Sequence, residues 1–98
     1  MSEERILYAR FTAKPGREAD VERLLADLVE RVRAEPGNTR FDAHRMTADH
    51  RAFFVYEAYR DARAFENHVT ADYGLAFNAA LADLIEEDGS QLTWLDRI

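Results

Sequence analysis

Residues 53–73 read FFVYEAYRDARAFENHVTADY and join an alternating pattern to a helical one. From Phe53 to Tyr59 the side chains alternate between two faces, as in a β-strand. Asp61 is a good N-cap residue, and apolar residues recur beyond it at helical spacing. Because His68 lies three residues after Phe65, both fall on one side of this helix. The stretch therefore predicts a strand followed by a helix, and their junction is our candidate for one wall of a pocket.

Patterns of the same kind cover the rest of the chain. The predicted elements are a strand over Arg5–Ala13, a helix over Arg17–Ala34, strands over Thr39–Met46 and Ala52–Arg60, a helix opened by Asp61 that breaks near Ala71 and resumes with Asp72 as its cap, and a strand over Gln91–Leu95. The helix over Arg17–Ala34 has a single apolar stripe: Val21, Leu24, Leu25, Leu28, Val29 and Val32. One apolar face also marks the resumed helix: Tyr73, Ala76, Phe77, Ala80, Leu81 and Leu84. The order β-α-β-β-α-β predicts an α+β, ferredoxin-like fold with one antiparallel sheet and both helices on one face.

Composition limits the classes of protein that fit. With 98 residues, 47% hydrophobic and 33% charged, we expect one globular domain over residues 1–98. A formal charge of −6 argues against a nucleic-acid partner. The sequence has no cysteine, so thiol chemistry and disulfides are excluded. The start is too charged for a signal peptide, and no apolar run approaches the ~20 residues of a membrane span. We expect a cytoplasmic protein without a membrane partner.

Both faces of the first and third predicted strands are apolar or aromatic. In an antiparallel sheet with helices on one side, the other face normally meets water and is polar. A chain of 98 residues has no third layer to cover that face. We therefore expect a homodimer in which two sheets pack face to face.

The histidines are His44, His50 and His68. No pair has the i, i+4 spacing of a helical metal site and there is no HExxH motif, so we expect no metal. His50 falls in a polar turn and is expected at the surface, whereas His44 could face either layer. His68 is the best candidate for a general acid or base, since its ordinary pKa of about 6.5 suits proton transfer near neutrality. The alternative is a rim histidine bonded to a backbone carbonyl.

Glu57 lies in the middle of a predicted strand, where a carboxylate is either paired or functional. Its candidate partners on neighbouring strands are Arg10, Arg40 and Arg45, so a salt bridge across the sheet or across the dimer interface is one interpretation. The other is a role in binding.

Aromatic residues are the remaining candidates. Tyrosines and one tryptophan form either a pocket for a flat ligand or an ordinary core: Tyr8, Tyr56, Tyr59, Tyr73 and Trp94. The sequence has no Walker A motif, no GxGxxG and no nucleophile elbow, so nothing points to a nucleotide or flavin site.

Four segments together resemble one family. KPGREADVERLL (14–25), RAEPGNTRFD (33–42), FVYEAY (54–59) and AFENHVTADY (64–73) are similar, in order and spacing, to the antibiotic biosynthesis monooxygenase domain family. The resemblance implies a dimeric α+β barrel. Many members are quinol or polyketide-quinone monooxygenases that use no flavin, haem or metal. In them the deprotonated substrate passes an electron directly to dioxygen.

Within the family, PGNTRFD and YEAY look closest to the isomerase of phosphorylated autoinducer-2, and YgiN-like quinol monooxygenases share the general frame. The isomerase has a histidine where this chain has Tyr73. Actinorhodin-type enzymes have an asparagine, a tryptophan and a tyrosine where this chain has Val55, Tyr59 and Phe65. The haem-degrading branch has a ligand histidine about where Asn78 falls.

The first functional hypothesis is oxidation of a small aromatic quinol or polyphenol with dioxygen, without a cofactor. His68 would accept the proton, Tyr59 and Tyr73 would orient substrate hydroxyls, and Phe65 would line the cavity. The further substrate-binding candidates are Tyr8, Arg40, Arg45, His44, Glu57 and Trp94.

Two other hypotheses stay open. One is acid/base isomerisation of a small phosphorylated dicarbonyl through the same residues. A phosphate would require arginines that converge on the pocket, whereas a quinol would require an apolar slot. The other is a ligand-binding domain without catalysis, which a cavity filled by aromatic side chains would favour.

Overall fold

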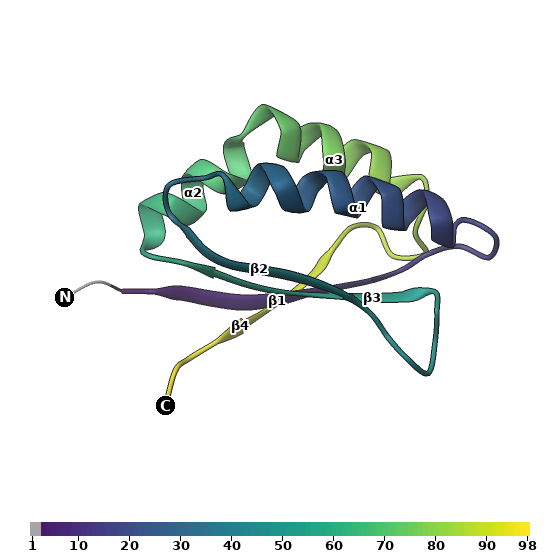
Figure 1. Cartoon of the computed structure of the whole chain (residues 1–98), viewed down its shortest axis with the longest axis horizontal. Coiled ribbons are helices and arrows are strands. Elements are labelled where there is room, and N and C mark those ends of the chain that lie inside the picture. Colours follow the sequence, from purple (N-terminus) through teal and green to yellow (C-terminus); the bar gives the residue numbers. More distant parts are fainter. Residues whose placement is uncertain (1–2) are drawn as a thin grey trace.

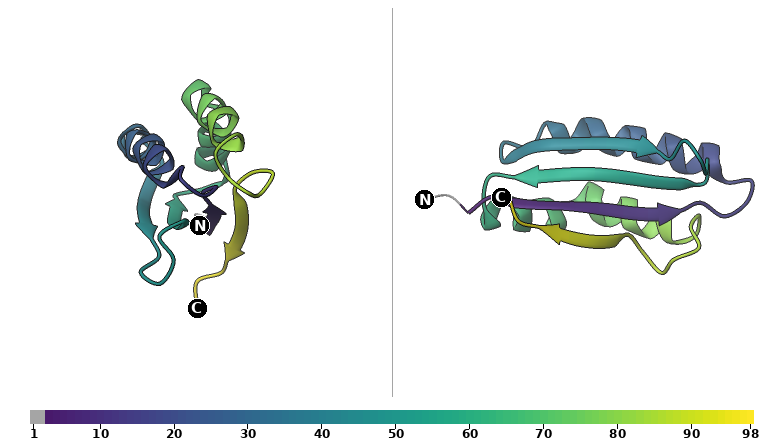
Figure 2. Two further views of the ribbon diagram at one scale, coloured as in Figure 1. Left: turned by 90° about the vertical axis from the view of Figure 1, so that its right-hand side faces the viewer. Right: turned by 90° about the horizontal axis from the view of Figure 1, so that it is seen from below.

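Four strands form one antiparallel sheet with the order β2-β3-β1-β4. The structure is a computed structural model and describes residues 3–98. The strands are β1 (Arg5–Thr12), β2 (Asn38–Arg45), β3 (Ala52–Tyr59) and β4 (Gln91–Leu95). Seen from below in Figure 2, they lie side by side with the helices behind them. The order and pairing confirm the predicted ferredoxin-like arrangement.

The helices are α1 (Glu18–Arg33), α2 (Ala62–Thr70) and α3 (Asp72–Ala82), and they all cover the same face of the sheet (Figure 1). The end-on view of Figure 2 places α1 on the side of β2 and α3 on the side of β4. Both the helix layer and the break between α2 and α3 agree with the sequence prediction.

A side-chain N-cap marks the start of α2, whereas α3 begins without one. The Asp61 side chain accepts a hydrogen bond from the backbone N–H of Ala64 at 2.8 Å, which confirms Asp61 as the N-cap. Ala71 is extended, with φ −66° and ψ 138°, and it ends α2 and precedes α3. The prediction that Asp72 caps α3 is wrong: Asp72 is its first residue, where its charge still favours the helix dipole.

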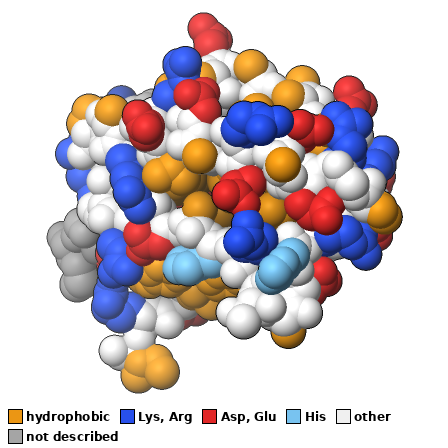
Figure 3. Space-filling view, turned by 45° about the vertical axis from the view of Figure 1, so that its right-hand side comes forward, with side chains coloured by type: hydrophobic (Ala, Val, Ile, Leu, Met, Phe, Trp, Pro, Cys, Tyr) orange, Lys and Arg blue, Asp and Glu red, His pale blue; other side chains and the backbone are white. Residues whose placement is uncertain are grey.

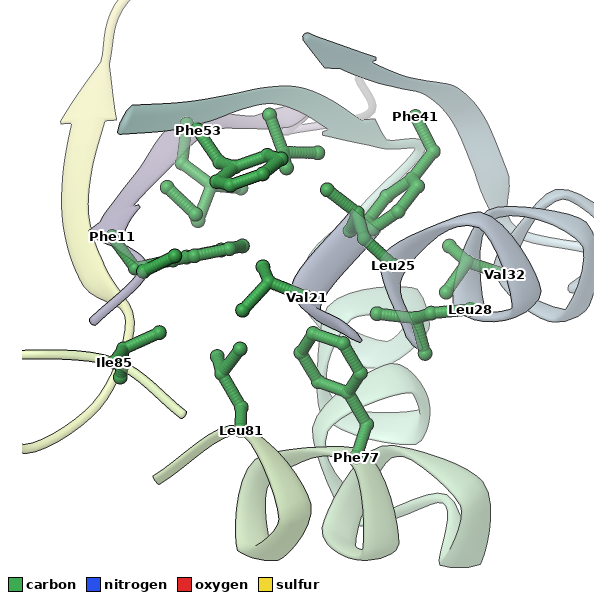
Figure 4. Close-up of a cluster of buried hydrophobic side chains, with 14 of the residues drawn as sticks. Phe11, Val21, Leu25, Leu28, Val32, Phe41, Phe53, Phe77, Leu81 and Ile85 are labelled. Atoms are coloured by element: carbon green, nitrogen blue, oxygen red, sulfur yellow. The ribbon is translucent and has the colours of Figure 1, made fainter. Parts of the chain in front are cut away.

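The core lies between the sheet and the helices (Figure 4). The predicted stripe of α1 is buried through Val21, Leu25, Leu28 and Val32. Figure 4 shows two side chains of α3 turned toward α1, Phe77 and Leu81, and both are buried. The buried face of α3 is narrower than predicted, because Ala76 and Ala80 are exposed. An alanine has too little side chain to require burial, so it marks a face weakly.

The other face of the sheet is aromatic. The rings of Tyr8 and Phe54 stack there at 5.0 Å, and both side chains are partly exposed, as is Tyr56. Figure 3 shows hydrophobic side chains among the mixed positive and negative charges of the surface. Over residues 3–98, no helix is both long and apolar enough to cross a membrane.

Candidate active site

A cavity of about 350 Å³ lies between the sheet and the helices, within the size range of small-molecule sites. Most of its wall is apolar and includes Leu7, Phe11, Val55, Phe65, Phe77 and Leu81. The side chains in its wall that carry polar groups are Glu57, His68, Asn78, Asp88 and Ser90. Among the described residues, no lysine or arginine lines this cavity. The site is therefore an apolar slot with a few polar groups and no cationic side chain.

Strand register places the carboxylate of Glu57 under this cavity. Across the sheet, Glu57 is paired with Phe41 of β2 and with Leu7 of β1, and Leu7 is paired with Trp94 of β4. Side chains at paired positions point to the same face of a sheet. This row faces the helices, so the carboxylate of Glu57 stands among apolar neighbours.

The side chain of His68, on α2, lines the same cavity as Glu57. Its side chain is 14% exposed, and its ring lies 4.9 Å from the ring of Tyr59, 6.0 Å from Phe65 and 6.2 Å from Phe41. The imidazole is thus enclosed by aromatic rings while one edge faces the cavity. This is the junction of strand and helix that the sequence singled out.

Two carboxylates flank the imidazole ring. The Nδ1 atom of His68 is 3.0 Å from Oε2 of Glu35, within hydrogen-bond distance. Its Nε2 atom is 3.9 Å from Oε1 of Glu57, which is too long for a direct hydrogen bond. The partner of Nδ1 is therefore a carboxylate and not the backbone carbonyl considered above.

Glu57 has no arginine partner in the part of the chain described. Its Oε1 atom accepts a hydrogen bond from the hydroxyl of Tyr59 at 2.7 Å. Burial raises the pKa of Glu57, and this outweighs the lowering by the Tyr59 hydrogen bond and by nearby His68. Arg40 pairs with Asp42 at 2.7 Å instead. Within residues 3–98 the predicted salt bridge to an arginine is absent, and the carboxylate of Glu57 lies at the cavity.

Two tyrosine hydroxyls donate hydrogen bonds to these carboxylates. The hydroxyl of Tyr73 donates to Oε2 of Glu35, as that of Tyr59 donates to Glu57. Burial and the hydrogen bond to Glu35 raise the pKa of Tyr73 to about 12. Burial and the Glu57 charge raise the pKa of Tyr59 further. Both tyrosines stay protonated at neutral pH and are hydrogen-bond donors, which leaves proton acceptance to His68 and the carboxylates.

Glu35 is the site residue that the sequence did not reveal. It follows α1 in the segment Glu35-Pro36-Gly37-Asn38, where it looked only like part of a helix stop. Gly37 is buried, and a Cβ atom placed on it would overlap the Cβ of Ala64 in α2. The turn after α1 therefore packs directly against α2 and brings Glu35 to His68. No local pattern signals such a contact.

Comparison with known proteins identifies the family. The family model described as antibiotic biosynthesis monooxygenase matches residues 5–80. The chain belongs to the antibiotic biosynthesis monooxygenase family. A comparison with curated proteins gave no match.

Solved structures agree with this assignment. PA3566 of Pseudomonas aeruginosa is 33% identical, with a TM-score of 0.91 over 100% of this chain and 97% of that one. Rv0793 of Mycobacterium tuberculosis is 22% identical, with a TM-score of 0.90 over 98% and 96% of the two chains. A structure described as antibiotic biosynthesis monooxygenase is 21% identical, with a TM-score of 0.89 over 96% and 98%. The last two structures, at 22% and 21% identity, show that this chain shares their fold.

In this antibiotic biosynthesis monooxygenase family member, several predicted binding residues lie away from the cavity. Tyr8 and His44 contact Phe54 on the outer face of the sheet, at ring distances of 5.0 and 6.1 Å. Arg40 lies over the ring of Tyr56 on that face, at 5.5 Å. Arg45 pairs with Glu22 of α1. These placements follow from strand alternation and register, which the sequence alone did not determine.

Of the remaining candidates, Phe65 lines the cavity, whereas Trp94 does not line it and packs against the ring of Phe65. The two rings meet edge to face at 4.9 Å, and Trp94 is 51% exposed on the edge strand β4. Residues 3–98 contain no group of three or more His, Asp or Glu side chains that could hold a metal ion. The structure thus brings together Glu57, Phe65 and His68 at the cavity, with Tyr59 behind Glu57.

Proposed function

We propose that this protein is a monooxygenase that oxidises a small, uncharged aromatic quinol or polyphenol with dioxygen, without flavin, haem or metal. Membership of the family supports monooxygenase-type chemistry. The observation that carries the finer proposal is the position of His68, which lies between two carboxylates at the polar part of an apolar cavity. A flat ring fits an apolar slot, and a hydroxyl on that ring meets the imidazole.

In this proposal the reaction begins with proton transfer. Nε2 of His68 takes the proton of a substrate hydroxyl, and the carboxylates of Glu35 and Glu57 stabilise the imidazolium that forms. The substrate anion then gives one electron to dioxygen, and the radical pair combines to form a carbon–oxygen bond. His68 returns its proton to the peroxide, which loses water. One oxygen atom enters the ring, the other leaves as water, and the quinol becomes a hydroxyquinone.

The cavity wall argues against the phosphorylated substrate of the isomerase hypothesis. A phosphate requires cationic or other strong donors that converge on it. Of the described residues that line the cavity, the acidic ones are Glu57 and Asp88, and none is lysine or arginine. A carboxylate wall repels a phosphate and accepts an uncharged hydroxyl. The open volume of about 350 Å³ also argues against a core filled by aromatic side chains.

The test is dioxygen uptake by metal-stripped protein with a panel of reduced quinols. We expect catalytic uptake without added flavin, and a loss of about 10²-fold or more in His68→Ala, the size typical of a general base. His50→Ala is the matched control, since His50 is exposed in the β2–β3 turn and its loss should leave uptake unchanged. No uptake with any quinol would contradict the proposed function. Equal uptake by both variants would contradict the role of His68.

A further inference from the structure

We propose that Glu35 is a positioning residue that fixes the tautomer of His68, so that the bare Nε2 atom faces the cavity. The catalytic meaning of this inference rests on the function proposed above, whereas the tautomer itself does not. Glu35 belongs to none of the strands or helices that line the cavity, and it does not line the cavity itself. It acts through the imidazole ring alone.

The side chains of Glu35 and His68 are in direct contact. Oε2 of Glu35 is 3.0 Å from Nδ1 of His68, and a carboxylate oxygen is an acceptor. The same oxygen accepts the hydroxyl of Tyr73. With Nδ1–H donating to Glu35, the neutral imidazole has its lone pair on Nε2. A general base requires this arrangement, because the other tautomer would present an N–H to the substrate.

Glu35 is also held in place by its surroundings. Its side chain is 15% exposed, and the buried Gly37 beside it packs against Ala64 of α2, the helix that carries His68. Tyr73, which donates to Glu35, carries the guanidinium of Arg31 over its ring at 5.8 Å. The carboxylate therefore has a fixed position relative to the imidazole, which a positioning residue requires.

Nε2 of His68 has no direct hydrogen bond to the carboxylate that it faces. The 3.9 Å between this atom and Oε1 of Glu57 is too long for a direct bond, and this gap leaves the lone pair of Nε2 open to accept a hydrogen bond of about 2.8 Å from a substrate hydroxyl. Tyr59 already donates to Oε1 of Glu57. The ionisable groups around His68 are thus Glu35 after α1 and Glu57 with Tyr59 on β3, with Tyr73 of α3 behind Glu35. A substrate hydroxyl placed in this gap has a lone pair on Nε2 to receive its proton.

The tautomer is measured by ¹⁵N NMR of the imidazole at a pH where His68 is neutral. We expect Nδ1–H in the unchanged protein, which is the form that free histidine disfavours. In Glu35→Gln the isosteric amide removes the charged acceptor, and we expect the population to move toward Nε2–H. Glu30→Gln removes a charge from an exposed position of α1 and should leave the tautomer as it was. An Nε2–H form in the unchanged protein would overturn the inference, whether or not the variant folds.

Kinetics separate this inference from the proposed function. With an active quinol, we expect Glu35→Gln to lower kcat by about tenfold or more and to change KM by less than about twofold, because Glu35 does not touch substrate. Tyr73→Phe keeps the carboxylate and should lower kcat less. If the tautomer shifts as expected and no quinol is oxidised, the positioning contact stands and the proposed function fails. An unchanged tautomer in a folded Glu35→Gln would overturn the positioning role.

Discussion

At the scale of single residues, Glu57 has a buried carboxyl group that lowers the stability of the fold when it is ionised, and it lines the cavity of the proposed site. The residue is 6% exposed, and burial raises the pKa of its carboxyl group. A group whose folded pKa lies above its unfolded value of about 4.3 lowers stability increasingly as the pH rises from the unfolded to the folded pKa. Below both values the group is protonated in either state and has no such effect. A buried carboxylate with a perturbed pKa at a cavity is typical of a functional site.

We therefore predict that Glu57→Gln raises the thermal midpoint at pH 7 and abolishes most dioxygen uptake. The amide keeps the shape of the side chain without its charge, and Tyr59 can still donate to it. The gain should shrink as the pH is lowered toward about 4.3, the ordinary value of a glutamate, and should be lost below it. Thermal unfolding at several pH values measures this. A lower midpoint at pH 7 would mean that the ionised group, held by Tyr59 and His68, stabilises the fold.

Gly37 gives a second prediction at this scale. A Cβ atom on residue 37 would overlap the Cβ of Ala64, so Gly37→Ala must displace either the turn or α2. We expect a loss of about 1–3 kcal/mol in the free energy of unfolding, the usual range for overpacking. Urea denaturation measures it. Gly89→Ala is the matched control, because nothing lies within 4 Å of its added atom and it should change stability little. Equal effects would refute the close approach.

The residues of the site differ in how far the sequence could predict them. His68 and Phe65 lie on one helix face near a strand end, and periodicity alone brought them together. For Glu57 the sequence left two interpretations open, a salt bridge to an arginine or a role in binding, because strand register was not determined. Glu35 could not be predicted at all, since its approach to His68 depends on one turn packing against a helix far along the chain.

At the scale of elements, periodicity and turn residues predicted the strands and helices to within a residue or two, except for the end of α3. This helix stops at Ala82, although its predicted apolar face extends to Leu84. The apolar stripe of α1 and the N-cap at Asp61 are strong local signals, and both are confirmed. The prediction failed where the local chemistry is ambiguous. An aspartate near a helix start fits either the cap or the first turn, and Asp72 occupies the first turn of α3.

The two aspartates provide a direct comparison. We predict that Asp61→Ala lowers the free energy of unfolding by about 1 kcal/mol, because the N–H of Ala64 loses its acceptor. Asp72→Ala should lower it by only a few tenths of a kcal/mol, because Asp72 contributes only to the helix dipole. Chemical denaturation of both variants measures the two losses in the free energy of unfolding. A larger loss in Asp72→Ala than in Asp61→Ala would mean that Asp72 caps α3 after all.

At the scale of the whole molecule, the outer face of the sheet remains to be covered. Tyr8, Phe54 and Tyr56 leave aromatic surface there, and Leu95 on β4 is 37% exposed. We propose that a second copy of the chain packs on this face, as the sequence suggested from the two apolar faces of β1 and β3. The element order specified the layers, but the sequence could not show that a cavity stays open between them.

A homodimer predicts a mass of about twice 11.3 kDa in sedimentation equilibrium. Phe54→Lys should give the monomer mass, because a two-fold face would bring its lysines together in an apolar contact. Leu75→Lys changes an apolar residue that is 54% exposed on α3 and should remain dimeric. A monomeric unchanged protein, or a dimer unaffected at Phe54, would contradict packing through this face.

In the proposed reaction, His68 deprotonates a quinol whose ring then takes one oxygen atom from dioxygen. Mass spectrometry of the product formed under ¹⁸O₂ by metal-stripped protein tests this reaction. We predict one ¹⁸O atom in the hydroxyquinone, the other in water, and almost no labelled product with His68→Ala. A quinone without label, accompanied by labelled hydrogen peroxide, would show an oxidase and contradict the proposed monooxygenase reaction.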